Sequence, residues 1–231
     1  YSYYTPPFRI FFFPVHYSAA CASVQSSTML RLTKARHTAI VSMEHCRNEG
    51  DVFTMDETRL MGMAREAGFG AGIIDTAQIC FDADFLKYCE ENKCGNYGAN
   101  YSCPPDCGTS DEMRARVLRF SRALVLTTRR PMPDFSDLET FRRCKRDHNR
   151  RMLELVHALR AQGVPCLMGG ASNCVLCERC AILDGKPCAD PQDRYSCLSA
   201  YCINVSELAK AAGMPYSWNK GEMTLYGIIA F

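Results

Sequence analysis

The chain has 231 residues, with 27 basic and 25 acidic side chains and a formal net charge of +2. Because 47% of the residues are hydrophobic and 23% are charged, the composition excludes a disordered chain, and no apolar run approaches the roughly 20 residues of a membrane-spanning helix. We therefore expect a soluble globular protein, and the near-neutral charge gives no general reason to bind nucleic acid or a membrane.

Residues 1–42 differ in composition from the rest of the chain. They contain no Asp or Glu, and their fixed charges are Arg9, Arg31, Lys34 and Arg36. An export signal is a poor match, because Pro14 and His16 interrupt the apolar stretch that follows Arg9. We expect translation to begin at Met43, or less plausibly at Met29. Residues 1–42 are then a non-native or disordered extension, and residues 43–231 form a single cysteine-rich metal-binding domain.

The first predicted elements alternate between helix and strand. Thr54 and Glu57 form a capping-box pattern for a helix that ends at Gly68, and residues 71–74 form a short apolar strand. Thr109 and Glu112 repeat the capping pattern. They open a second helix that carries Met113, Val117 and Leu118 inward, and residues 123–126 follow as a buried strand.

The longest predicted helix begins at Ser136, with Glu139 as its capping partner, and ends at Gly163. Strands are predicted at residues 164–168 and 224–229. This order predicts an α/β (α+β) protein with a single mixed sheet, flanking helices and two cysteine-rich metal-binding loops. The basic side chains of the long helix are expected to form its solvated face: Arg142, Arg143, Lys145, Arg146, Arg150 and Arg151.

Cysteine is the residue whose count is unusual. The chain has 15, an odd number, and eight of them lie in two short stretches of sequence, with Cys197 and Cys202 soon after the second. A secreted disulfide framework is normally a short chain with an even number of cysteines. Clustered thiols in a chain of this length instead indicate metal binding in a reducing compartment, so we expect a cytoplasmic protein.

The more specific of the two stretches runs over residues 174–188. Cys174, Cys177 and Cys180 have the C-x2-C-x2-C spacing that presents three sulfurs to an iron–sulfur cubane, as in bacterial ferredoxins. Cys188 is the nearest fourth ligand, with Cys197 and Cys202 as competitors. A zinc site is the alternative, although a four-thiolate zinc site typically builds from two separated pairs.

A second candidate site covers residues 89–107, in which four cysteines lie among glycines and prolines: Cys89, Cys94, Cys103 and Cys107. Gly95 and Gly98 allow the backbone to wrap closely around a bound group, and Pro104 and Pro105 stiffen the chain after Cys103. With three cysteine ligands the site has an open coordination position, as catalytic centres do. With Cys107 added it closes, and the pattern leaves both possibilities open.

Together these motifs resemble the predicted metal-binding proteins grouped as domain of unknown function 2284. The resemblance runs from about Thr54 to the C-terminus and rests on the residues 89–107, on Cys174, Cys177 and Cys180, and on Pro187 with Cys188. It implies metal binding through these cysteines, in a family that is widespread in anaerobes and carries no established activity. Cys107, Cys197 and Cys202 fall outside the recurring cysteine positions, and a glycine is usual where this chain has Cys202.

The expected function is electron transfer, or electron donation to a partner reductase. The histidines after the expected start, His45, His148 and His157, lie far from both cysteine-rich stretches in sequence, so all-thiolate ligation of a [4Fe–4S] cluster is the simplest expectation. The alternative is a zinc-stabilised structural or binding module without a redox role. A third hypothesis is an enzyme that binds its substrate at an open site on Cys89, Cys94 and Cys103. The partner is expected to be a redox protein, while the oligomeric state is not specified by the sequence.

Overall fold

The computed structural model describes residues 56–216 and 221–231. All of these residues fall in one compact unit, which is built on a five-stranded sheet with the order β1-β2-β5-β3-β4. The strands are β1 (Gly70–Asp75), β2 (Arg122–Pro131), β3 (Leu167–Gly170), β4 (Ser196–Cys197) and β5 (Glu222–Ala230). β5 lies between β2 and β3 and pairs antiparallel with both, whereas β3 and β4 are parallel. The predicted fold class, a mixed sheet with flanking helices, is confirmed.

Five helices accompany the sheet in the described part of the chain. They are α1 (Glu57–Glu66), α2 (Phe85–Glu90), α3 (Ser110–Leu118), α4 (Leu138–Arg160) and α5 (Val205–Ala211), with two short 3₁₀ turns at Thr76–Gln78 and Ala181–Asp184. Both cysteine-rich stretches lie in long connections of the sheet. Residues 89–107 belong to the excursion from β1 to β2, and residues 174–188 belong to the connection from β3 to β4.

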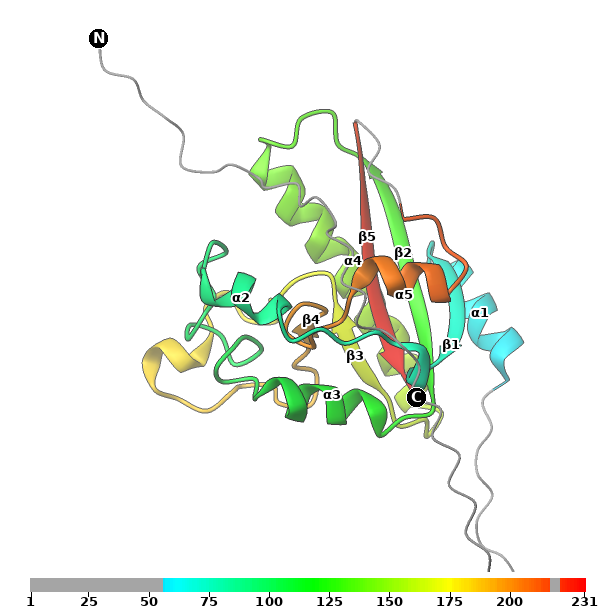
Figure 1. The fold of residues 1–231 in the computed structure, drawn as a ribbon, viewed down its shortest axis with the longest axis horizontal. Coiled ribbons are helices and arrows are strands. Elements are labelled where there is room, and N and C mark those ends of the chain that lie inside the picture. The colour runs from blue at the N-terminus through cyan, green and yellow to red at the C-terminus, as the bar shows by residue number, and fades with distance from the viewer. Residues whose placement is uncertain (1–55, 217–220) are drawn as a thin grey trace, which may run out of the picture. The chain divides into compact units, whose positions relative to one another are not determined.

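The helices cover both faces of the sheet (Figure 1). Alternate residues of a strand point to opposite faces. Ala123 and Val125 of β2 accordingly pack in the core cluster that contains α3 and α5, whereas Leu124 and Leu126 pack with α1 and α4. Buried on both faces, β2 has the continuous apolar run that the sequence showed at residues 123–126.

The predicted helices and strands exist, but several of their details were wrong. Thr109 and Glu112 do form the capping box of α3, and Met113 and Val117 are buried. Leu118, predicted to face inward, is 41% exposed at the end of this helix. The third strand begins at Leu167 rather than at residue 164, because the amide of Val164 still donates to the carbonyl of Leu159 at the helix end.

The caps of the first and the longest helix also differ from the prediction. Thr54 lies outside the described residues, and the N-cap of α1 is Asp56, which accepts a hydrogen bond from the Thr58 amide at 2.9 Å. The N-cap of α4 is Asp137 rather than Ser136, and it accepts from the Thr140 amide at 2.9 Å. The Ser136 hydroxyl donates instead to Asp134. In both cases a nearby Asp takes the capping role, which is chemically equivalent to that of Ser or Thr.

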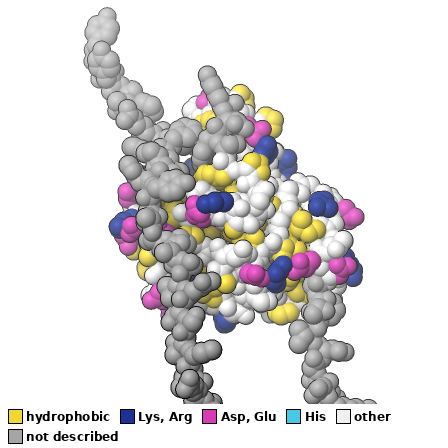
Figure 2. Space-filling view, turned by 45° about the vertical axis from the view of Figure 1, so that its right-hand side comes forward, with side chains coloured by type: hydrophobic (Ala, Val, Ile, Leu, Met, Phe, Trp, Pro, Cys, Tyr) yellow, Lys and Arg dark blue, Asp and Glu magenta, His cyan; other side chains and the backbone are white. Residues whose placement is uncertain are grey.

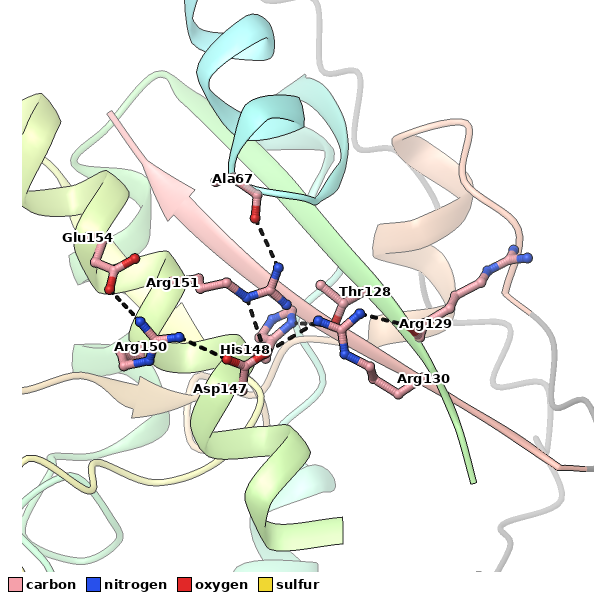
Figure 3. Close-up of polar contacts among 9 residues, drawn as sticks. All are labelled: Ala67, Thr128, Arg129, Arg130, Asp147, His148, Arg150, Arg151 and Glu154. Carbon is pink, nitrogen blue, oxygen red and sulfur yellow. Dashed lines mark hydrogen bonds and ion pairs between the residues drawn. The ribbon is translucent and has the colours of Figure 1, made fainter. Parts of the chain in front are cut away.

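The basic side chains of α4 do not all lie on a solvated face. Arg151 is only 16% exposed, stacks on the Phe69 ring and donates to the carbonyl of Ala67 at 2.9 Å. Figure 3 shows the carboxylate of Asp147 in ion pairs with Arg130, Arg150 and Arg151. These contacts attach α4 to β2 and to the end of α1.

His148 lies next to this ionic group and is fully buried. Its Nδ1 is 2.8 Å from the hydroxyl of Thr128, and its ring meets Phe69 edge to face. Burial, and then the positive charge of Arg151, lower the pKa of His148 to about 3. The imidazole is therefore neutral at physiological pH and serves as a core residue.

The surface combines charges of both signs. On the face that Figure 2 shows, Lys and Arg side chains are interspersed with Asp and Glu and with apolar patches. Among the described residues no helix has the length and apolar character needed to cross a bilayer.

Candidate metal centre

The residues 89–107 are attached to the sheet through the segment that follows β4. Phe81 forms an isolated antiparallel bridge with Ile203, the Asp82 amide donates to the carbonyl of Cys202, and the Asn204 amide donates to the carbonyl of Cys80. This pairing fixes the start of the excursion beside the end of β4. α2 then carries Cys89 on its last turn, and the chain folds back on itself where the Gly98 amide donates to the carbonyl of Pro104.

A first cysteine group forms where this excursion meets β4. We define it as Cys89, Cys94, Cys103, Cys107 and Cys197. Burial, followed by the charge of Cys197, raises the pKa of Cys89 to about 12 and that of Cys107 to about 11. Burial and the charges of Cys197 and Cys94 raise the pKa of Cys103. Cys197 thus lies within electrostatic reach of every other thiol in the group.

Polar and charged neighbours offset part of the effect of burial on Cys197. The backbone amides of Ala200 and Ser199 donate hydrogen bonds to its sulfur, and Lys145 of α4 is close enough to lower its pKa, although burial raises the pKa overall. Lys145 itself lies over the Phe141 ring, 4.3 Å from the centroid. Burial lowers the pKa of Lys145, while Cys197 and Cys94 raise it. The group therefore combines several thiols with a partly buried cation.

Cys202 lies near this group, but its surroundings are different. Its backbone has a φ of 59°, in the left-handed region that favours glycine. The side chain is 2% exposed, and burial, then Asp82, Asp111 and Cys197, raise its pKa. Two carboxylates beside a thiol disfavour the thiolate that a metal requires.

The second cysteine group consists of Cys174, Cys177, Cys180 and Cys188. All four line one cavity, together with Asn100 and Tyr101 from the other cysteine-rich stretch. The backbone amides of Leu176 and Tyr195 donate to the sulfur of Cys174. Burial raises the pKa of Cys174, and the charges of Cys188 and Cys177 raise it further. Cys177 is exposed to solvent, whereas the other three are partly buried.

Direct hydrogen bonds join the two groups. The amide of Cys174 donates to the hydroxyl of Ser102 at 2.9 Å, and that hydroxyl lies 3.8 Å from the sulfur of Cys103. Asn100 donates to the carbonyl of Cys174 at 3.0 Å, and the Tyr101 hydroxyl donates to the carbonyl of Lys186 at 2.8 Å. Ser102 is fully buried. A single serine hydroxyl therefore spans from one group to the other.

The donor set of both groups fits a thiolate-bound metal. Iron–sulfur clusters and zinc both take cysteine thiolates, and N–H donors to sulfur tune and orient such ligands. Within residues 56–216 and 221–231, no three His, Cys, Asp or Glu side chains are arranged so that they hold a single metal ion as they stand. The second group lines a shared cavity and does not converge on one point.

The structure places the eight predicted cysteines in two neighbourhoods and adds Cys197 to one of them. The eight predicted cysteines fall into the two groups, four in each, and Cys188 lies with Cys174 and Cys177 as its place in the sequence suggested. Cys197 was considered only as a competitor of Cys188, but the structure places it with the first group. The short apolar run 195–203 could have indicated a strand there, because Cys197 lies on it beside the buried Leu198.

Comparison with known proteins identifies one related group. A family model described as predicted metal-binding protein (DUF2284) matches residues 72–231. This range includes both cysteine groups and all strands except the first residues of β1. No curated protein and no solved structure matches the sequence.

Proposed function

Because the chain belongs to the DUF2284 family of predicted metal-binding proteins, we propose that its second cysteine group holds an iron–sulfur cluster, that its first group holds a second metal, and that the protein passes electrons to a partner reductase in the cytoplasm. The observation that carries this proposal is the second group, in which three cysteines with C-x2-C-x2-C spacing and Cys188 line one cavity. No histidine lies among the residues that line that cavity. An all-thiolate ligand set of this kind favours low-potential electron transfer.

Each part of the chain has a defined role in this proposal. The second group would hold a [4Fe–4S] cluster through Cys174, Cys177, Cys180 and Cys188. The first group would hold the second metal through Cys89, Cys94, Cys103 and Cys107, with Cys197 as a further ligand. A bound cluster supplies one-electron redox chemistry. The backbone amides of Leu176 and Tyr195, and those of Ala200 and Ser199, would stabilise thiolate charge at the two groups.

The path between the groups and the route to solvent also support electron transfer. Ser102 joins the Cys174 backbone to the Cys103 sulfur through contacts of 2.9 and 3.8 Å. Cys177 is exposed, and Val175 and Leu176 beside it are 39% and 38% exposed. A redox partner that covers this apolar rim would approach the second group closely.

The test is electron paramagnetic resonance of the anaerobically purified protein after reduction with dithionite. We expect a signal from a reduced [4Fe–4S] cluster, which Cys177→Ala removes. Cys144→Ala is the matched control, because Cys144 lies on α4 outside both groups, and it should leave the signal unchanged. A protein without any signal on reduction, or a Cys177→Ala variant with the signal intact, would contradict the proposal.

A further inference from the structure

A second cavity, of about 300 Å³, lies beside the two cysteine groups. Its walls come from Tyr101, from Arg116 of α3, from Arg160 of α4, from β3, and from the segment that leads into β4. The volume is at the lower end of the range for small-molecule sites. The cavity is also polar, because three arginines, two tyrosines and Ser196 are among its lining residues.

The arginines of this cavity are neutralised unequally. Arg160 donates to Asp193 at 2.6 Å and to the carbonyl of Gln192 at 3.1 Å, and Asp193 also contacts His157. Arg116 and Arg194 differ from Arg160, because no carboxylate of the described residues lies within 4.0 Å of either guanidinium, although Glu112, one turn before Arg116 on α3, acts on Arg116 from farther away. Arg116 donates to the sulfur of Met113 at 3.2 Å, and Arg194 lies over the Tyr101 ring at 5.9 Å.

Both guanidinium groups are only partly exposed. Placing a cation at the wall of a cavity costs free energy unless an anion or several hydrogen-bond acceptors compensate for the lost water. A methionine sulfur and an aromatic ring are weak compensation, whereas a carboxylate or phosphate group accepts two hydrogen bonds from one guanidinium. The cavity therefore has an excess of positive charge and the donors to bind an anion.

We propose that this cavity binds a small organic anion through a carboxylate or phosphate group held by Arg116 and Arg194. Ser196 offers a further hydroxyl at the wall. The inference goes beyond the proposed function, because anion binding by these arginines does not require a particular metal.

An anion bound in this cavity would lie next to both cysteine groups. Tyr101 and Arg194 line both this cavity and the one that the second cysteine group surrounds. The cavity also adjoins the first group. The charge of Arg116 lowers the pKa of Cys107, and Ser196 directly precedes Cys197. If the metal groups are redox centres, as proposed above, a molecule bound here is the candidate small-molecule redox partner.

Isothermal titration calorimetry tests the proposal with malonate and inorganic phosphate as probes, on the full chain as purified. We expect saturable binding of at least one probe, weakened at least tenfold in Arg116→Gln and in Arg194→Gln, since each variant removes a charge-assisted hydrogen-bond pair. The matched control is Arg142→Gln on the exposed face of α4, which should bind like the wild type. Tighter binding of malonate would indicate a carboxylate ligand, and tighter binding of phosphate would indicate a phosphoryl group.

Two results would overturn the proposal: no saturable binding of either probe, or the same loss of affinity in Arg142→Gln as in the cavity variants. Because Arg116 is part of α3 and contacts the buried Met113, its variant could fail to fold, and then Arg194→Gln compared with the charge-conserving Arg194→Lys decides. The metal content of the same samples separates the two proposals, since a protein that purifies with zinc alone would contradict the iron–sulfur assignment and still give a clear answer on anion binding.

Discussion

Cys197 and Cys202 are close in sequence, yet their surroundings assign them different roles. Burial raises the pKa of Cys197, but two backbone amides that donate to its sulfur and the charge of Lys145 offset part of that effect. Cys202 instead has a left-handed backbone and two neighbouring carboxylates, which disfavour its thiolate. The resemblance noted above leads us to expect a glycine at this position, and the positive φ gives a physical reason for one, because glycine adopts it without steric cost.

Replacing each of these two cysteines tests whether it is a metal ligand or only occupies a backbone position that suits glycine. We expect Cys197→Ala to lose the metal of the first cysteine group. Cys202→Gly should keep the full metal content, and its free energy of unfolding should stay within about 1 kcal/mol of the wild-type value, because relief of left-handed strain of roughly 1–2 kcal/mol offsets the lost side-chain packing. Metal analysis and urea denaturation measure both effects. Equal metal loss in the two variants would make Cys202 a ligand as well.

At the same scale, spacing predicted eight ligand candidates in two stretches, and their role as metal ligands stays a prediction. Spacing could not predict that Cys197 lies near the first cysteine group, because the pairing of residues 80–82 with residues 202–204 brings it there. Such a contact joins segments that are distant in sequence and leaves no local pattern. Local patterns also could not predict that Lys145 faces the thiols, since a lysine in a basic run on a helix normally points to solvent.

At the scale of elements, the docking of α4 on β2 depends on a neutral histidine. His148 is buried next to Arg151, and its only hydrogen-bond contact among the described residues is the one between Nδ1 and Thr128. An unfolded chain binds a proton at histidine below a pH of about 6.5, whereas the folded protein resists protonation down to a pH of about 3. The unfolded state therefore binds more protons across this interval, and stability rises with pH within it.

Replacing His148 with Asn should remove this pH dependence while keeping a polar atom near Thr128. Between pH 4 and pH 6, we expect the free energy of unfolding of the wild type to change more steeply than that of His148→Asn, by up to about 1.4 kcal/mol per pH unit. Urea denaturation of both proteins over this range provides the comparison. Parallel curves would mean that His148 does not titrate differently in the folded and unfolded states.

Sequence patterns predicted the elements better than their ends. Apolar periodicity located α4 and the capping box located α3, since both signals are local. The start of α4 was misplaced because Ser136 and Asp137 are adjacent capping residues, and the sequence does not show which one reaches the first free amides. The strand order, with the C-terminal β5 between β2 and β3, also could not be read from the pattern.

At the scale of the whole molecule, the sheet serves as a frame that brings two loops together. The excursion from β1 to β2 and the connection from β3 to β4 leave the sheet separately, yet they meet through Ser102, Asn100 and Cys174. The arginine-lined cavity adjoins both cysteine groups. In this arrangement the helices and strands hold the loops, and the loops carry the candidate metal ligands and part of the cavity wall.

The most direct test of this account is the metal and sulfide content of the protein purified without oxygen. We expect iron and acid-labile sulfide in nearly equal amounts, with zinc well below stoichiometry, and a loss of both iron and sulfide when Cys174 and Cys177 are replaced by Ala. Stoichiometric zinc with neither iron nor sulfide would contradict the account and would make the protein a zinc-stabilised module.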